Sequence, residues 1–449
     1  MNKNGPLAVP DFRFLIAGQF ASTIGDYCYA VALPWLVLSN HGSAALLGTV
    51  LACYGVPRTV LIPVGGILAD KIGPRTLMML ADLGRCLLVA VLALLAARHT
   101  ASLVALGPTA ALIGAGEGLF LPASYSILPS LLDGERLGAG NALSSAAVQA
   151  GSLLGPSVGG ALVAITGAST AAFVIDAVSF AVSALTLALI RPAAEQAGAM
   201  LSGLRSASDE GRQHLEAPAS EEAQENVLKL LVRWRPMRVI LLVTIAANLA
   251  GGGMSEVALP SLAHARWGAG GYGALLACFA AGALIGTLGA TRTTSVSKPA
   301  IFISVLFMVN ALADALIPFA GGQVGAAIAF FVAGATNGMA NVVAITMVQK
   351  AIPPALTGRI IGAVMLCSFG SFPLSVAVTG LLVRHFGPVP FFPVAGATLA
   401  LALLYGLSQR EFRVFGTAQA TQLDEVVDEV NRAIDPMGAP AQAAEGSRR

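Results

Sequence analysis

Eight charged side chains lie within long apolar stretches of the sequence, and their types allow acid–base and ion-pair chemistry there. A charge in an apolar medium is costly, so such residues pair with one another, bind a ligand or exchange protons in a water-filled cavity. Asp82 and Arg85 are three residues apart, on one face of a helix, and we expect them to pair locally. The eight residues are Asp26, Arg58, Asp82, Arg85, Glu117, Asp176, Glu256 and Asp314.

The composition indicates that membrane-spanning helices carry these side chains. Of 449 residues, 56% are apolar and 11% are charged, against roughly 25% charged in a soluble domain. Mean hydropathy is +0.76, and about twelve apolar stretches have the ~20 residues needed to cross ~30 Å of hydrocarbon. They are placed near residues 12–38, 44–68, 75–97, 103–129, 138–166, 168–191, 237–263, 270–291, 299–320, 322–350, 358–384 and 388–409.

Several function classes have no support in the residues. A net charge of +2 without a basic cluster interleaved with aromatics gives no indication of nucleic-acid binding. The five cysteines stand singly, the five histidines are not near other ligands at metal spacing, and no glycine-rich phosphate loop is present. We therefore expect no metal, no cofactor and no enzymatic activity.

A long polar interruption divides the apolar stretches six and six. It predicts an N-terminal six-helix bundle (1–191), a cytoplasmic central loop (192–236), a C-terminal six-helix bundle (237–409) and a cytoplasmic tail (410–449). The end of the loop, ENVLKLLVRWRPMR, has the pattern of an amphipathic helix on the membrane surface. TQLDEVVDEVNRAID (421–435) predicts a helix in the tail.

The basic residues predict the orientation. If both termini and the central loop are cytoplasmic, only Arg98, Arg266 and Arg384 of the 26 lysines and arginines lie on the outer side. Positive charge collects in the short cytoplasmic turns of membrane proteins. We therefore predict a multi-pass protein of the plasma membrane, namely a bacterial inner membrane, with both termini cytoplasmic.

The two halves of the sequence resemble each other. YCYAVALPWL at 27–36 parallels GMSEVALPSL at 253–262, and GTVLACYG at 48–55 parallels GALLACFA at 273–280. GAGEG at 114–118 resembles GATNG at 334–338. Matches in the same order favour a parallel repeat of two helix bundles, an arrangement that transporters build around a midplane site.

A polar turn between the second and third apolar stretches, GGILADKIGPR, resembles the loop signature of the major facilitator superfamily. In that family the acidic residue contacts the N-terminal end of the eleventh helix, near 357–359 here, and helps hold the outward-facing state. The alternative is an ordinary solvated loop. The matching residues are Gly65, Asp70, Lys71, Gly73 and Arg75.

A second match, GSLLGPSVGG, resembles the antiporter motif of the same family. Small residues at these spacings allow close helix approach, and a mid-helix proline bends the helix. A plain helix-packing face is the alternative. The stretches 119–145 and 347–364 further resemble the branch of macrolide and siderophore exporters. The residues that match the motif are Gly151, Gly155, Pro156, Gly159 and Gly160.

The resemblance places four of the charged residues on helices that line the family's central cavity: Asp26, Arg58, Glu117 and Glu256. Asp26 and Arg58 are candidates for an ion pair, which would keep Asp26 ionised. Proton coupling is therefore expected at Glu117 or Glu256. Asp176 and Asp314 belong to peripheral helices in the family arrangement, where a packing or capping role is expected rather than transport.

These observations predict an all-α integral membrane protein of twelve transmembrane helices, in two six-helix bundles related by a parallel pseudo-repeat around a central cavity. The resemblance implies a monomeric secondary exporter of a small amphipathic molecule, such as a drug, antibiotic or siderophore, in exchange for protons. An importer or lipid translocator on the same fold is the main alternative. A membrane scaffold or sensor is another, and a membrane-embedded enzyme would need convergent catalytic groups that the sequence does not offer.

Overall fold

The computed structural model describes residues 5–40, 42–98, 102–191, 235–290, 296–351 and 354–414, and these ranges are built from helices. The central loop and the tail, with their predicted surface helices, fall almost entirely outside the described residues. The first half comprises α1 (Pro10–Ser39), α2 (Ala44–Ile72), α3 (Pro74–Ala97), α4 (Leu103–Ser126), α5 (Leu128–Leu131), α6 (Gly134–Thr166) and α7 (Thr170–Leu189).

The second half begins with a composite helix. α10 (Arg235–Gly253) continues through a π-helical turn, Met254–Ala258, into α11 (Leu259–Arg266). The remaining helices are α12 (Gly268–Ala290), α13 (Pro299–Leu316), α14 (Gln323–Ala351), α15 (Pro354–Phe386), α16 (Phe391–Ser408) and the short α17 (Arg410–Val414).

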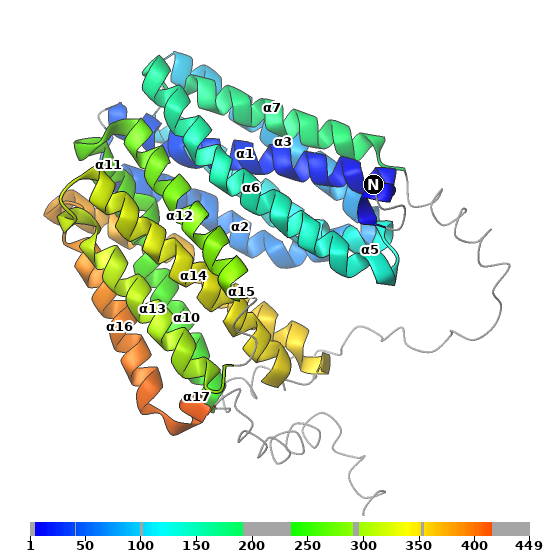
Figure 1. Cartoon of the computed structure of the whole chain (residues 1–449). Coiled ribbons are helices and arrows are strands. Elements are labelled where there is room, and N and C mark those ends of the chain that lie inside the picture. The colour runs from blue at the N-terminus through cyan, green and yellow to red at the C-terminus, as the bar shows by residue number, and fades with distance from the viewer. Residues whose placement is uncertain are drawn as a thin grey trace, which may run out of the picture.

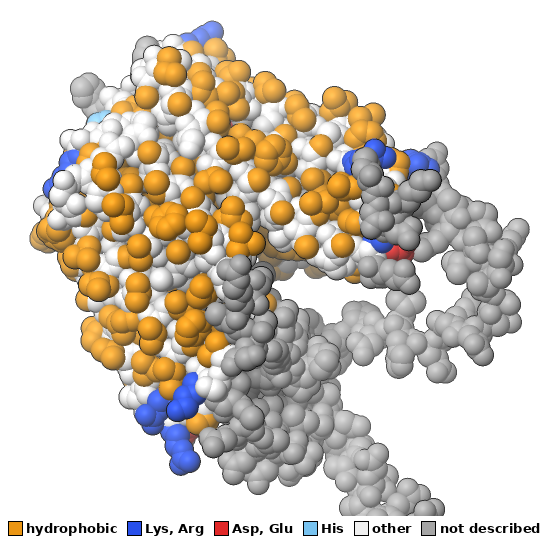
Figure 2. All heavy atoms as spheres, viewed as in Figure 1, with side chains coloured by type: hydrophobic (Ala, Val, Ile, Leu, Met, Phe, Trp, Pro, Cys, Tyr) orange, Lys and Arg blue, Asp and Glu red, His pale blue; other side chains and the backbone are white. Residues whose placement is uncertain are grey.

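The prediction of twelve membrane spans is confirmed. Twelve helical segments among the described residues are long and apolar enough to cross a bilayer. Figure 2 shows apolar side chains spread over the flanks of the helices, with lysine and arginine side chains near the helix ends. This distribution matches a lipid-facing belt bounded by polar interfaces.

The two halves share a core at one end of the molecule only. One cluster of buried side chains joins residues of both halves, such as Leu47 of α2 and Val376 of α15. At the opposite end each half has its own cluster, around Phe12 and Met78 in the first and around Ile303 and Phe412 in the second. The halves therefore meet at the end where α1 passes to α2, the closed end, and diverge at the end where α2 passes to α3, the open end (Figure 1).

Two matched glycine crossings make the junction at the closed end. α2 crosses α15 where Gly48 faces Gly380, and a Cβ added at Gly48 would lie 3.0 Å from the Cα of Gly380. α12 crosses α6 where Gly273 faces Gly160, and a Cβ at Gly273 would lie 2.9 Å from the Cα of Gly160. The parallel repeat seen in the sequence therefore recurs as a repeat of backbone contacts.

Candidate functional site

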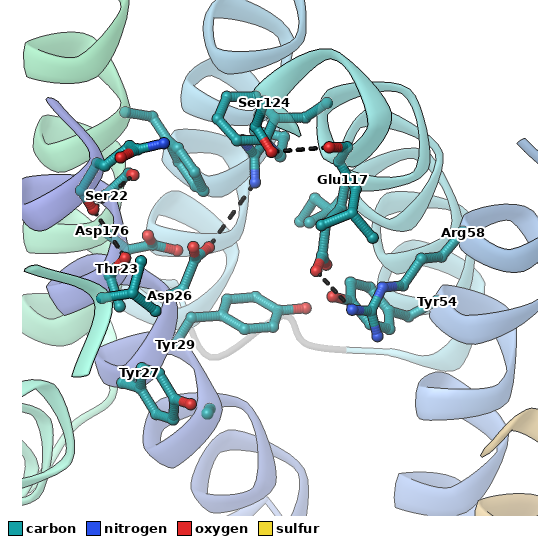
Figure 3. Close-up of a pocket in the computed structure, with 18 of the residues that line it drawn as sticks. Ser22, Thr23, Asp26, Tyr27, Tyr29, Tyr54, Arg58, Glu117, Ser124 and Asp176 are labelled. Carbon is teal, nitrogen blue, oxygen red and sulfur yellow. Dashed lines mark hydrogen bonds and ion pairs between the residues drawn. The ribbon is translucent and has the colours of Figure 1, made fainter. Parts of the chain in front are cut away.

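A cavity of about 700 Å³ opens within the first half, beside the second. Side chains from α1, α2, α3, α4, α6 and α7 line it, together with Glu256 and Phe372 from the second half. It contains most of the charged residues singled out in the sequence (Figure 3). The aromatic side chains of Tyr27, Tyr54 and Phe120 add apolar wall.

Arg58 pairs with Glu117, not with Asp26 as expected. Its Nη2 lies 2.9 Å from Oε1 of Glu117, and both side chains are about one-fifth exposed. Figure 3 shows the pair spanning from α2 to α4 across the cavity wall. The Asp26–Arg58 interpretation was therefore wrong, because the rotation of α4 points Glu117 toward Arg58.

Glycines bring α2 and α4 close enough for this pair. A Cβ on Gly114 or Gly118 would collide with the backbone carbonyl of Tyr54 or Arg58, respectively. In the second half Gly334 and Gly338 approach the carbonyls of Phe279 and Ala283 in the same manner. The packing is duplicated without the charges, since Asn337 replaces Glu117 and instead accepts a hydrogen bond from Asn341 (2.9 Å).

Arg85 is at the centre of a second group of charges. As expected, it pairs with Asp82 on the same helix, and both side chains are almost fully buried. Its Nη1 also lies 3.8 Å from Oδ1 of Asp26, whose side chain is 48% exposed to the cavity. The guanidinium lies over the ring of Phe180 (4.3 Å) and over that of Phe120 (4.6 Å), contacts that suit an arginine held away from water.

Glu256 lies where the two halves meet. It is part of the π-helical turn between α10 and α11, in which the Leu259 N–H donates to the Met254 carbonyl five residues earlier. Such turns are frequent at functional sites because they rotate one side chain out of the helical register. The Ser375 hydroxyl of α15 braces the preceding turn, accepting from the Gly253 N–H at 2.7 Å and donating to the Leu249 carbonyl at 2.5 Å.

A second cavity, of about 600 Å³, lies within the second half. Glu256 and Phe372 line both cavities, so the two spaces flank one wall. Its polar lining includes Asn310, Asp314 and Asn341, which come from α13 and α14. Sequence reasoning did not select the asparagines, although the i, i+4 spacing of Asn337 and Asn341 places both on one helix face.

Two acidic residues assigned to packing also line these cavities. Asp176 of α7 is 1% exposed, borders the first cavity and lies against α1, where a Cβ at Gly25 would be 2.6 Å from its Oδ1. Asp314 of α13 borders the second cavity. For Asp176 the predicted packing role agrees with its burial against α1, and for Asp314 that role stays a prediction. α7 and α13 each pack one face against neighbouring helices, and the carboxylate lies on that face.

The polar turn from Gly65 to Arg75, here called the gating loop, has the local structure that its residues suggest. Gly65 meets α4 closely, with a Cβ position 2.8 Å from the Pro122 ring, and Gly73 ends α2 with a positive φ of 85°. Arg75 donates to the carbonyls of Leu187 and Ala188 at the end of α7, both at 2.7 Å. Asp70 and Lys71 are exposed at the open end. The side chains of 357–359, the expected partner of Asp70, lie outside the described residues.

The glycines of the second motif divide between two helices. Gly151, Gly155 and Gly159 face α1, where their Cβ positions would meet Thr23, Tyr27 and Cys28. Gly160 faces α12 at the closed end, and the Pro156 carbonyl lies against Gly273 in the same crossing. The motif thus sets the spacing of α6 both within its own half and against the other half.

Two helix bundles that meet at one end around paired half-cavities form an arrangement that transporters build around a midplane site. A family model described as "Major Facilitator Superfamily" matches residues 15–376. The chain therefore belongs to this superfamily of transporters, and the predicted family and fold are confirmed. Family and fold alike are those of transporters and not of enzymes.

Two relatives of this chain are named as efflux proteins. The chain is 27% identical over 397 residues to the multidrug efflux pump Tap of Mycolicibacterium fortuitum, covering 85% of this chain and 90% of Tap. It is 26% identical over 420 residues to the enterobactin exporter EntS of Shigella boydii, covering 90% of this chain and 94% of EntS. The crystal structure of the nucleoside transporter NupG superposes with a TM-score of 0.68 at 13% identity, covering 89% of this chain and 98% of NupG. This likeness shows the fold alone.

Proposed function

We propose that this protein is a monomeric exporter of a small amphipathic molecule in a bacterial inner membrane, driven by exchange for protons. The efflux activities in the names of Tap and EntS support the direction, as does the match of Gly151–Gly160 to the antiporter motif. Cavities lined by aromatic and charged side chains suit a molecule with apolar and polar parts. A drug, an antibiotic or a siderophore fits this description.

The distribution of basic residues supports an orientation with the open end and both termini in the cytoplasm. Lys71, Arg75 and Lys298 belong to short turns at the open end, whereas Arg98 and Arg384 lie at the closed end. The structure is then an inward-facing state, ready to take substrate from the cytoplasm. Opening of the closed end and joining of the open end would complete alternating access.

One observation carries the coupling proposal: Glu256 is a carboxylate of the second half that forms no hydrogen bond or ion pair with the described residues and lines both cavities. Arg58 of the first half lines the first cavity together with Glu256. Glu117, by contrast, is already paired with Arg58. A carboxylate without a fixed partner is the better site for reversible proton binding, so Glu256 is favoured over Glu117.

Arg58 links proton binding on Glu256 to the contact between the two halves. Its guanidinium lies over the ring of Phe369 in α15 at 4.6 Å, while Thr59 donates to the Phe369 carbonyl at 3.1 Å. An ionised Glu256 attracts Arg58 away from Glu117, and a protonated Glu256 releases it. The proton on Glu256 thereby shifts an ion pair at the boundary between the two halves.

The gating loop is proposed to act in the outward-facing state, in which the open end is closed. Asp70 has no ion pair or hydrogen bond within the described part of the chain, and it is exposed at the diverging ends of the halves. When the open end closes, a carboxylate there is placed to bind the N-terminal end of α15, where unpaired N–H groups favour an anion. Asp70 would then stabilise the outward-facing state.

Conservative variants test the coupling proposal. In proteoliposomes with an imposed pH gradient, we expect Glu256→Gln to lose gradient-driven transport while keeping downhill exchange of substrate. Glu117→Gln is the matched control, and we expect it to remain driven by the gradient at a reduced rate. The substrates should include ethidium, a macrolide and a catecholate siderophore. Full gradient-driven transport by Glu256→Gln would refute the role of Glu256.

A further inference from the structure

The cavity of the second half has an acidic and aromatic lining, with no lysine or arginine among its described lining residues. Asp314 and Glu256 contribute the carboxylates. The rings of Phe279 and Phe330, which both line the space, pack together with centroids 4.8 Å apart. The charge and the apolar wall are thus presented to the same volume.

Asp314 has an unsatisfied polar atom in this cavity. Its Oδ1 is buried and accepts no hydrogen bond from the described residues. Nearby amide donors are engaged elsewhere: Asn310 donates to the Ala333 carbonyl at 2.9 Å, and Asn341 donates to the carbonyl and side chain of Asn337. A buried carboxylate left in this way is costly unless a ligand supplies a proton donor or a positive charge.

The cavity of the first half contrasts with this arrangement. There Arg58 and Arg85 already provide positive charge next to Glu117 and Asp82. A cationic ligand entering the first cavity meets these guanidinium groups as well as carboxylates. In the second cavity the described lining offers carboxylates, rings and neutral polar side chains, but no lysine or arginine. Positive charge next to aromatic faces is itself favourable when water is excluded.

We propose that the second cavity binds the charged group of a lipophilic organic cation, with Asp314 as its counter-ion and the Phe279–Phe330 pair as its apolar wall. The ligand class is a quaternary or protonated amine, or a phosphonium ion, carrying bulky apolar substituents. The proposal rests on the proposed function in one respect, namely that the ligand is the exported molecule. It concerns binding and does not depend on proton coupling.

Equilibrium dialysis of the purified full chain in detergent tests this binding directly. Tetraphenylphosphonium is the cationic probe, and progesterone is an uncharged apolar probe of similar size. We expect Asp314→Asn to weaken tetraphenylphosphonium binding about tenfold or more, since an interaction with a charged group is lost. Progesterone binding should change less than twofold, and Asp314→Glu should retain a substantial part of the cation affinity.

Asp176→Asn is the matched control, because it removes one buried carboxylate from the first cavity. It should leave tetraphenylphosphonium binding within about threefold of the unmodified protein, since Asp176 borders the first cavity and shares no partner with Asp314. Size-exclusion profiles and thermal unfolding verify that each variant is folded. If Asp314→Asn does not fold, Asp314→Ser takes its place as the variant without the charge, with the same selective loss of cation binding expected.

Four results would overturn the proposal. These are no tetraphenylphosphonium binding by the unmodified protein, unchanged binding by the Asp314 variants, equal loss of both probes, or a selective loss in Asp176→Asn alone. Each leaves the export proposal standing, because that proposal is tested separately by gradient-driven transport. Conversely, cation binding without gradient-driven transport would refute the proposal of proton exchange and would leave the proposed Asp314 site supported.

Discussion

Adding a methyl group at the paired glycine crossings should disfavour the state in which the closed end is joined. A Cβ at Gly48 would lie 3.0 Å from the Cα of Gly380, and one at Gly273 would lie 2.9 Å from the Cα of Gly160. Backbone carbonyls of Val376 and Pro156 are nearer still. Because carbon atoms pack best at about 3.5–4.0 Å, the helices must separate by roughly 0.5–1 Å.

The expected cost follows from overpacking. Forcing an extra methyl group into a tight contact costs about 1–3 kcal/mol, and that cost applies only in the state where the helices cross closely. One substitution should therefore shift the equilibrium away from the closed-end state by roughly 5- to 150-fold. Gly48→Ala and Gly273→Ala lie in separate crossings, so their effects should be about additive in free energy.

Pulsed electron–electron distance measurements provide the assay. After replacement of the five native cysteines, spin labels at the exposed Asn40 and Arg384 report the closed end, and labels at Lys71 and Lys298 report the open end. We expect Gly48→Ala and Gly273→Ala to lengthen the Asn40–Arg384 distances and to shorten the Lys71–Lys298 distances. The reciprocal change distinguishes a shift between states from local damage.

Matched controls are available on the same helices. A Cβ at Gly66 of α2 meets no atom within 4 Å, and one at Gly270 of α12 meets only the Ala164 side chain at 3.5 Å. Gly66→Ala and Gly270→Ala should leave both distance distributions unchanged. Unaltered distributions in Gly48→Ala and Gly273→Ala would refute the reasoning, as would equal shifts in the controls.

Two further predictions concern the loop from Gly65 to Arg75. Arg75→Gln should lower the free energy of unfolding by about 1–3 kcal/mol, seen as a lower thermal midpoint in detergent, because the hydrogen bonds to the end of α7 are lost; an unchanged midpoint would contradict this. Asp70→Asn should change stability by less than about 0.5 kcal/mol, since Asp70 is exposed, yet it should lengthen the Lys71–Lys298 distances. The absence of any change in those distances would refute the proposal that Asp70 stabilises the outward-facing state.

Local features were predictable from the sequence because they depend on residues near one another in the chain. The Asp82–Arg85 pair follows from i, i+3 spacing, and the turn at Gly73 follows from glycine's access to positive φ. The spans follow from the length of apolar runs.

Choices between distant partners were not predictable in this way. Arg58 had two candidate carboxylates on other helices, and the axial rotation of α4 against α2 selected Glu117 over Asp26. The same rotations turned Asp176 and Asp314 toward the cavities, and the π-helical turn set the direction of Glu256. None of these rotations leaves a periodic signal in an apolar sequence, since nearly every face of each helix is hydrophobic.

The sequence by itself therefore determined which segments span the membrane, where backbones approach closely and which half of the repeat carries the charges. The tertiary structure alone decided which charges meet, which stay without a partner and which end of the molecule is closed. The physical reason is that apolar periodicity and glycine spacing act along one helix, whereas ion pairing and cavity lining depend on how separate helices are rotated and tilted against each other.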